Sequence, residues 1–197
     1  MNTLVERLLR RYARGEAAAV SEYVIGDRVL DLGSAEGWVP EALAVRTGSF
    51  ACGVDVGSYR RARAPYAVYD GRRLPFGDAA FDTTLVLLTL HHCDAPETVL
   101  DEAVRVTRCR LVVTESVYRT RLERFWLDRL DGRVNGFRHG GRMRRALGFR
   151  RAEEWRRLFE TRGLDVVAER WLGSPLERLV HHPLLFALDV SRRCPGS

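Results

Sequence analysis

The segment Arg28-Val-Leu-Asp-Leu-Gly-Ser-Ala-Glu-Gly37 decides the fold. Its first residues form a short apolar run typical of a buried strand, and Gly33 begins a turn. A helix is expected from Trp38 to about Thr47, with Pro40 in its first turn, where proline is tolerated. Glycine lets the backbone adopt a positive φ and approach a ligand closely, and a helix N-terminus favours a carboxylate or phosphate. The segment therefore predicts a strand, a ligand-binding turn and a helix.

The spacing of small residues in this turn separates two kinds of nucleotide-binding turn. A dinucleotide-binding turn needs small residues at its first, third and sixth positions, and the sixth position here is Trp38. A G-x-G-x-G turn needs them at its first, third and fifth positions, which are Gly33, Ala35 and Gly37. The turn fits the second pattern, with alanine in place of the central glycine, so we reject the dinucleotide interpretation.

Predicted strands and helices alternate around this segment. Repeated β-α-β units with short connections call for a parallel sheet with helices on both faces. We expect helices over residues 1–24, 96–108 and 152–161, and further strands over residues 50–55, 67–70, 82–90, 110–115, 164–171 and 183–190. Asp94 is expected to cap the 96–108 helix. An Arg-rich helical insertion over 119–150 is expected to cover the substrate site of a single domain spanning 1–197.

Acidic residues recur where the predicted strands end. Asp55 closes the 50–55 strand, where a carboxylate can accept hydrogen bonds from two ribose hydroxyls. Asp70 closes the next strand, where it can accept from an adenine amino group. Either aspartate alone would also suit a turn or a helix cap. Together with the glycine turn at the same edge of a parallel sheet, the two indicate a nucleoside-binding site.

Successive motifs along the chain resemble those of class I S-adenosylmethionine-dependent methyltransferases, and most of all the methyltransferase type 11 group. The residues that carry the resemblance are Val29-Leu-Asp-Leu-Gly-Ser-Ala-Glu-Gly37, Gly53-Val-Asp55, Asp70-Gly-Arg-Arg-Leu-Pro-Phe76, Phe81-Asp82 and Leu90-His-His92. The resemblance spans Arg28 to Val190. It implies an α/β fold, a Rossmann-like three-layer sandwich whose seven-stranded sheet is mostly parallel, with an antiparallel last strand over 183–190.

The resemblance also implies a binding site for S-adenosylmethionine, with S-adenosylhomocysteine as the product. The methionine part would lie along Gly33, Ala35 and Gly37, with its ammonium group held by Asp31. The ribose would be held by Asp55, and the adenine by Asp70 and the backbone of Gly71. The sulfonium and methyl group would be flanked by the stretch Leu88-Thr-Leu-His-His92, including Leu88 and Leu90.

A sulfonium is already an activated methyl donor, so a general base is needed only for a protonated nucleophile. The candidates are His91 and His92, which follow the fourth predicted strand, and His139, which lies in the insertion. A histidine at a strand end can also simply pack or bond to a backbone carbonyl. We expect no metal site, because adjacent residues of an extended chain point to opposite sides and His91 and His92 would not converge on one ion.

Charge is unevenly distributed along the chain. The formal net charge is +6, all 32 basic residues are arginine, and residues 119–157 carry 13 arginines against five acids. This segment could attract an anionic acceptor or RNA, or could be the solvated face of helices. We expect a small-molecule acceptor, and RNA methylation and non-catalytic cofactor binding stay open as alternatives. Oligomeric state is not predicted.

Targeting signals and cysteine spacing bear on the compartment. No apolar run approaches the roughly 20 residues that a transmembrane helix needs, and the N-terminus has no apolar signal region. Four cysteines lack metal-binding spacing and are too few for a disulfide scaffold. We therefore expect a cytoplasmic protein with unpaired thiols.

Overall fold

The computed structural model describes residues 3–129, 148–173 and 182–190. The segment that decides the fold forms strand β1 (Arg28–Leu32), a turn and helix α2 (Trp38–Thr47), as predicted. Two glycines in the left-handed conformation bound α2: Gly37 at its start, with φ 78°, and Gly48 at its end, with φ 74°. These φ angles are costly for other residues, which explains why the chain turns sharply at both ends of α2.

The described strands form a seven-stranded sheet in the order β3-β2-β1-β4-β5-β7-β6. The strands beyond β1 are β2 (Phe50–Asp55), β3 (Tyr66–Val68), β4 (Phe81–Leu87), β5 (Thr107–Ser116), β6 (Leu164–Trp171) and β7 (Pro183–Val190). The pairs from β3 to β5 are parallel, whereas β7 runs antiparallel to both β5 and β6. The predicted fold class, including the antiparallel last strand, is confirmed.

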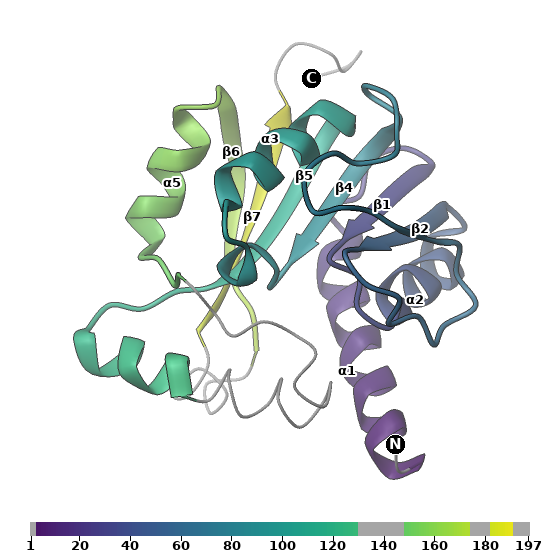
Figure 1. The fold of residues 1–197 in the computed structure, drawn as a ribbon, viewed down its shortest axis with the longest axis horizontal. Coiled ribbons are helices and arrows are strands. Elements are labelled where there is room, and N and C mark those ends of the chain that lie inside the picture. The colour runs from purple at the N-terminus through teal and green to yellow at the C-terminus, as the bar shows by residue number, and fades with distance from the viewer. Residues whose placement is uncertain (1–2, 130–147, 174–181, 191–197) are drawn as a thin grey trace.

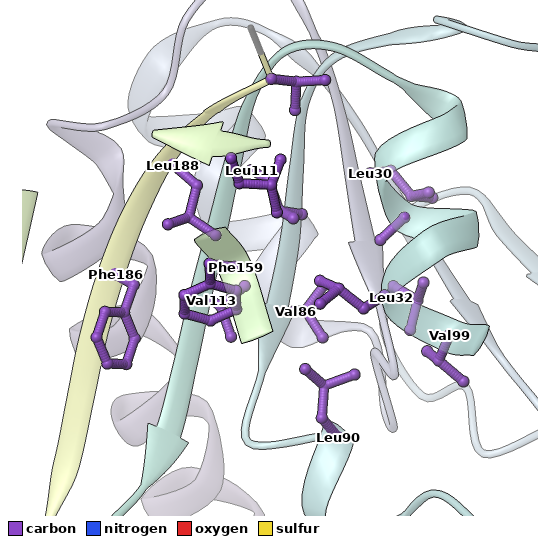
Figure 2. Packing of buried hydrophobic residues seen from close by; sticks show 14 of the residues in the cluster. Leu30, Leu32, Val86, Leu90, Val99, Leu111, Val113, Phe159, Phe186 and Leu188 are labelled. Atoms are coloured by element: carbon purple, nitrogen blue, oxygen red, sulfur yellow. The ribbon is translucent and has the colours of Figure 1, made fainter. Parts of the chain in front are cut away.

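Helices cover both faces of the sheet and make three layers (Figure 1). They include α1 (Thr3–Ser21), α3 (Pro96–Val106) and α5 (Ala152–Glu160). Neighbouring strand residues point to opposite faces. Thus Val29 packs with α1 and α2, whereas Leu30 packs with α3 and α5. Figure 2 shows the second of these cores, in which Phe159 of α5 lies against the strands.

Several predicted boundaries need correction. The fourth strand ends at Leu87 and not at residue 90, because Leu88 has a φ of 52° that breaks the strand. The third strand is shorter and earlier, over residues 66–68. Thr107 begins β5 and does not belong to the preceding helix. Asp94 does not cap α3, since the cap position is Ala95 and makes no side-chain bond.

The Arg-rich insertion lies only partly within the described residues. Residues 121–129 are helical, as expected, and Ala152–Glu160 forms the helix that follows the insertion. The rest of the insertion, including the candidate base His139, lies outside the described residues. Its expected role over the substrate site therefore stays a prediction.

Two further expectations concern membranes and thiols. Over the ranges 3–129, 148–173 and 182–190, no helix combines the length and hydrophobicity that crossing a bilayer requires. Cys52 and Cys93 are in the reduced thiol form, as expected. Cys109 is disulfide-bonded, which corrects the expectation for that residue.

Candidate functional site

A cavity of about 1160 Å³ opens at the carboxyl ends of the parallel strands. This edge is where open α/β sheets bind ligands, because the loops after neighbouring strands converge there. The cavity is lined by nine of the predicted site residues: Asp31, Gly33, Ala35, Asp55, Asp70, Gly71, Leu88, His91 and His92. Two others are placed differently, since Gly37 is at the start of α2 and Leu90 is buried in the core.

Gly33 allows the turn after β1 to lie directly against the loop after β4. It has a φ of 79°, and a Cβ atom there would overlap the side chain of Thr89. Its N–H donates to the Val54 carbonyl at 2.8 Å, which ties the turn to β2. The turn is therefore fixed on both sides by the neighbouring strands.

Ala35 occupies the position where the motif has its central glycine, and its backbone is strained. Its φ is 45°, in the left-handed region that costs an L-amino acid roughly 1–2 kcal/mol. Two hydrogen bonds hold it there: its N–H donates to Asp55 Oδ2 at 2.9 Å, and its carbonyl accepts from the Tyr66 hydroxyl at 3.0 Å. The surrounding contacts thus impose on alanine the conformation that glycine adopts freely.

Asp55 ends β2 as a buried carboxylate facing this turn. Besides the bond from Ala35, its Oδ1 accepts the N–H of Val56 at 2.7 Å. Burial raises the pKa of Asp55 above its ordinary value, and the backbone donors offset part of that increase. A carboxylate has about four acceptor sites, so Asp55 can order the turn and still accept from a ligand hydroxyl.

Asp31 is a second buried carboxylate on the wall of the same cavity. Burial raises its pKa from 3.8 to about 7, the Ser34 hydroxyl lowers it, and the nearby Asp55 raises it further. Asp31 also contributes to the raised pKa of Cys52, after the larger effect of burial. A carboxylate in this state is stabilised by any cation that enters the cavity beside it.

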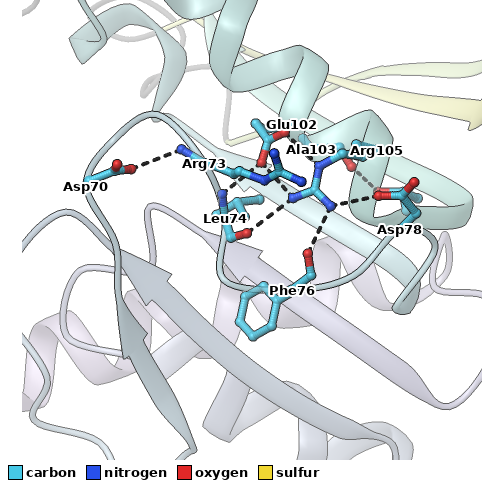
Figure 3. A network of polar contacts seen from close by, with 9 residues as sticks. Asp70, Arg73, Leu74, Phe76, Asp78, Glu102, Ala103 and Arg105 are labelled. Atoms are coloured by element: carbon cyan, nitrogen blue, oxygen red, sulfur yellow. Dashed lines mark hydrogen bonds and ion pairs between the residues drawn. The ribbon is translucent and has the colours of Figure 1, made fainter.

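The loop that carries Asp70 and Gly71 is exposed but well anchored. Asp70 Oδ1 accepts the N–H groups of Arg72 at 2.8 Å and Arg73 at 3.0 Å, and these bonds lower its pKa. Further along, Arg105 of α3 holds the loop by donating to the carbonyls of Leu74 and Phe76 and by pairing with Asp78 and Glu102 (Figure 3). This network fixes the position of Asp70 at the mouth of the cavity.

The loop after β4 turns through a strained residue into a short 3-10 helix, η1 (Leu90–His92). Leu88 has a φ of 52° and donates its N–H to the Thr114 carbonyl at 2.7 Å. The next two N–H groups, of Thr89 and Leu90, both donate to Glu115 Oε1, at 3.1 and 2.7 Å. Glu115 therefore determines how this loop leaves the sheet.

The two histidines of η1 lie side by side against the cavity. His91 Nδ1 is 2.6 Å from Glu115 Oε2, and both side chains are almost fully buried. The His91 ring stacks on Phe149 with centroids 4.8 Å apart, and its centroid is 4.1 Å from that of His92. A buried histidine–carboxylate pair at the cavity wall can accept and stabilise a proton.

Sequence reasoning missed one wall of the cavity and the partner of His91. The missed wall is formed by α1 and the start of α2, through Leu9, Tyr12, Ala13, Glu16, Trp38 and Val39. The available signal was Tyr12, an aromatic residue that continues the apolar stripe of α1 but remains half-exposed. Glu115 was visible only as the polar end of an apolar strand, a feature that does not reveal its partner.

The described lining is acidic. Its carboxylates are Glu16, Asp31, Glu36, Asp55, Asp70 and Asp94, against the single arginine Arg72 among the described lining residues. Across the part of the chain that the structure describes, no three histidine, cysteine, aspartate or glutamate side chains are grouped as metal ligands. The charge of the cavity suits a cationic or hydroxyl-bearing ligand better than a polyanion.

Comparison with known proteins agrees with this geometry. Residues 30–110, which contain the turn, both strand-end aspartates and the two histidines, match a family model described as a methyltransferase domain. A comparison with curated proteins finds no match.

Solved structures share the fold at low sequence identity. A chain of the complex between the Haloferax volcanii Trm112 methyltransferase activator and a methyltransferase is 16% identical, with a TM-score of 0.72, over 97% of this chain and 94% of that one. Geranyl diphosphate C-methyltransferase from Streptomyces coelicolor A3(2), solved with S-adenosyl-L-homocysteine, is 15% identical over 91% and 75%, with a TM-score of 0.68. The [4+2]-cyclase SpnF is 16% identical over 89% and 80%, with a TM-score of 0.65.

The matched segment contains all the residues that line the cavity except those of α1, and the structural likeness extends over the whole sheet. Because all these identities are below 25%, the solved structures indicate the fold of this chain and do not indicate its reaction. Residues 30–110 thus resemble a methyltransferase domain, and the whole chain shares the fold of methyltransferases of known structure.

Proposed function

We propose that this protein transfers a methyl group from S-adenosylmethionine to a small organic acceptor by direct in-line displacement. The observation that carries the proposal is one cavity that gathers the glycine turn, Asp55 at the end of β2, Asp70 after β3, and the loop after β4. Each group comes from a different strand end, and the parallel sheet brings them to one edge.

The residues of the cavity fit the cofactor by their chemistry. Asp31, whose burial leaves it poorly solvated, would hold the ammonium group, and the 33–37 turn would lie along the methionine part. Asp55 would accept from the ribose, and Asp70 with the Gly71 backbone would hold the adenine. When bound, S-adenosylmethionine supplies a methyl group already activated by its sulfonium.

The protein then has to orient the acceptor and keep water from the reacting atoms. Leu88 and His91 line the cavity where the loop after β4 meets the turn after β1, at the position where the resemblance puts the methyl group. Holding two reactants in line can supply most of the rate enhancement of such a displacement. The His91 ring is a candidate base, and the wall formed by α1 would contact the acceptor.

A small acceptor is favoured over RNA by the acidic lining of the cavity. A phosphate backbone would face six carboxylates and one arginine among the described lining residues. The basic segment 119–157 keeps RNA as an alternative, which a salt-sensitive shift of an RNA probe would support. Non-catalytic cofactor binding is the other alternative, since Ala35 stands at the position where the motif has its central glycine. A cytoplasmic location stays a prediction.

Calorimetric titration with S-adenosylhomocysteine tests the proposal. We expect one site per chain and a loss of affinity of at least tenfold in Asp55→Ala, which removes the ribose acceptor and the bond to Ala35. Asp189→Asn is the matched control, because Asp189 pairs with Arg110 on β5, outside the cavity. Absence of binding by the parent protein, or equal binding by Asp55→Ala, would contradict the proposal. Binding without turnover on any acceptor would favour the non-catalytic alternative.

A further inference from the structure

We propose that Glu115 is a positioning residue that holds His91 as the general base of methyl transfer, so that the acceptor is a protic nucleophile such as a phenol, an enol or an amine. This inference rests on the proposed function and adds the class of acceptor to it. It follows from the contacts of one buried carboxylate.

Glu115 lies near the end of β5, next to the loop that leaves β4. Its side chain is fully buried, and its two carboxylate oxygens bond to different groups. Oε1 accepts the N–H groups of Thr89 and Leu90, whereas Oε2 bonds to His91 Nδ1 at 2.6 Å. One carboxylate therefore fixes both the backbone of the loop and the imidazole that the loop presents to the cavity.

The His91 ring is also fixed by its neighbours. Phe149 stacks on it at an interplanar angle of 23°, and the Gly148 N–H donates to the His91 carbonyl at 3.3 Å. The His92 ring packs beside it at an angle of 43°. Rotation of the imidazole would break the bond to Glu115 and these ring contacts together, so the ring keeps one orientation at the cavity wall.

The hydrogen bonds of Glu115 determine the tautomer of His91. Backbone N–H groups can only donate, so two donors on Oε1 stabilise the charged carboxylate. The carboxylate then accepts from Nδ1–H of His91, which leaves the lone pair of the neutral imidazole on Nε2. A carboxylate that orients a histidine in this way also stabilises the imidazolium formed when Nε2 takes a proton.

In the proposed step, a lone pair of the acceptor forms the bond to the methyl carbon while the carbon–sulfur bond breaks and its electron pair stays on sulfur. The proton of the acceptor O–H or N–H passes to Nε2 of His91, and Glu115 stabilises the resulting imidazolium. The products are the methylated acceptor, S-adenosylhomocysteine and a protonated His91, which returns its proton to solvent. An acceptor without a proton on its nucleophilic atom would gain nothing from this arrangement.

Glu115→Gln separates positioning from packing, because it keeps the shape of the side chain. The N–H groups of Thr89 and Leu90 require the amide oxygen at the Oε1 position, so the amide NH2 faces His91. Nδ1 must then accept, and the proton moves to Nε2, where it blocks the base. Glu169→Gln is the matched control, since Glu169 pairs with Arg156 and does not line the cavity.

Nitrogen-15 NMR of histidine-labelled protein reads the tautomer directly, with the His91 signal assigned from its loss in His91→Asn. We expect a protonated Nδ1 and an unprotonated Nε2 in the parent protein and in Glu169→Gln, and the reverse in Glu115→Gln. A purely structural Glu115 would leave the tautomer of a folded variant unchanged. The Nε2-protonated form in the parent protein would overturn the inference.

Methyl transfer to a panel of phenols, enols and primary amines, with thioethers and tertiary amines as aprotic counterparts, tests the acceptor class. Loss of the base is expected to lower kcat for protic acceptors by about 10²–10⁴-fold in Glu115→Gln, with KM for S-adenosylmethionine and affinity for S-adenosylhomocysteine unchanged. Failure of the parent protein to bind S-adenosylhomocysteine would refute the proposed function. The tautomer measured by NMR tests the role of Glu115 independently of cofactor binding. Turnover of aprotic acceptors alone, or an unchanged kcat in Glu115→Gln, would overturn the inference.

Discussion

Replacing Asp31 by asparagine is expected to stabilise the protein relative to the parent by an amount that grows as the pH rises from 5 to 8. The pKa of Asp31 is about 7 in the folded protein and 3.8 when unperturbed, chiefly because the side chain is buried. Between these two values the folded state binds more protons than the unfolded state, so the free energy of unfolding falls as pH rises. The stabilising contribution of the neutral carboxyl is complete below pH 3.8 and is lost as pH passes through 7.

The size of this effect follows from the two pKa values. Their difference corresponds to about 4 kcal/mol in total, of which about 2.5 kcal/mol falls between pH 5 and pH 8. Asparagine imitates the neutral carboxyl and does not titrate, so the gap in stability between Asp31→Asn and the parent should widen by that amount. Asp55, whose pKa is also raised, is present in both proteins, and most of its titration cancels.

Urea unfolding followed by tryptophan fluorescence at pH 5, 6, 7 and 8 measures the gap directly. Asp189→Asn serves as the control, and its stability relative to the parent should not follow this pH dependence. The same Asp31→Asn protein should bind S-adenosylhomocysteine more weakly at pH 8, because it lacks the charge for the ammonium group. Parallel stability curves for Asp31→Asn and the parent would refute the reasoning.

Two glycine-related predictions follow from the turn after β1. Ala35→Gly should stabilise the protein by about 1 kcal/mol, because relief of a left-handed alanine outweighs the added freedom of the unfolded chain; an unchanged or lower urea midpoint would contradict this. Gly33→Ala should destabilise it by about 2 kcal/mol or more, since the new Cβ overlaps Thr89. Gly48→Ala, at a residue with a similar φ but nothing within 4 Å, should lower the free energy of unfolding by less. Equal losses of stability in the two variants would contradict the argument, because they would mean that the Thr89 side chain moves aside at little cost.

The sheet could be predicted because its signals are local. The apolar run of β1 and the glycine that follows it specify a strand and a turn without help from distant residues. The short connections between predicted strands then leave a parallel sheet as the natural arrangement. Predicted boundaries were wrong where a tertiary contact decides them: the strand ends before Leu88, whose φ is 52°, and the N–H of Leu90 then donates to the Glu115 side chain on the next strand. No local pattern encodes that bond.

The candidate site was partly predictable for the same reason. Motif positions place Asp31, Asp55 and Asp70 at strand ends, and parallel pairing brings those ends together. The partner of His91 could not be read from the chain, because Glu115 is 24 residues away and meets it only through the pairing of β4 with β5. The wall formed by α1 was hidden because its residues follow an ordinary amphipathic pattern, which predicts burial without saying against what.

A crystal structure of the protein grown with S-adenosylhomocysteine tests the central claim most directly. We expect the adenosine between Asp55 and Asp70 and the amino-acid tail along residues 33–37, with its ammonium group beside Asp31. Density for the ligand at another place on the molecule, or none in this cavity under saturating conditions, would contradict the account.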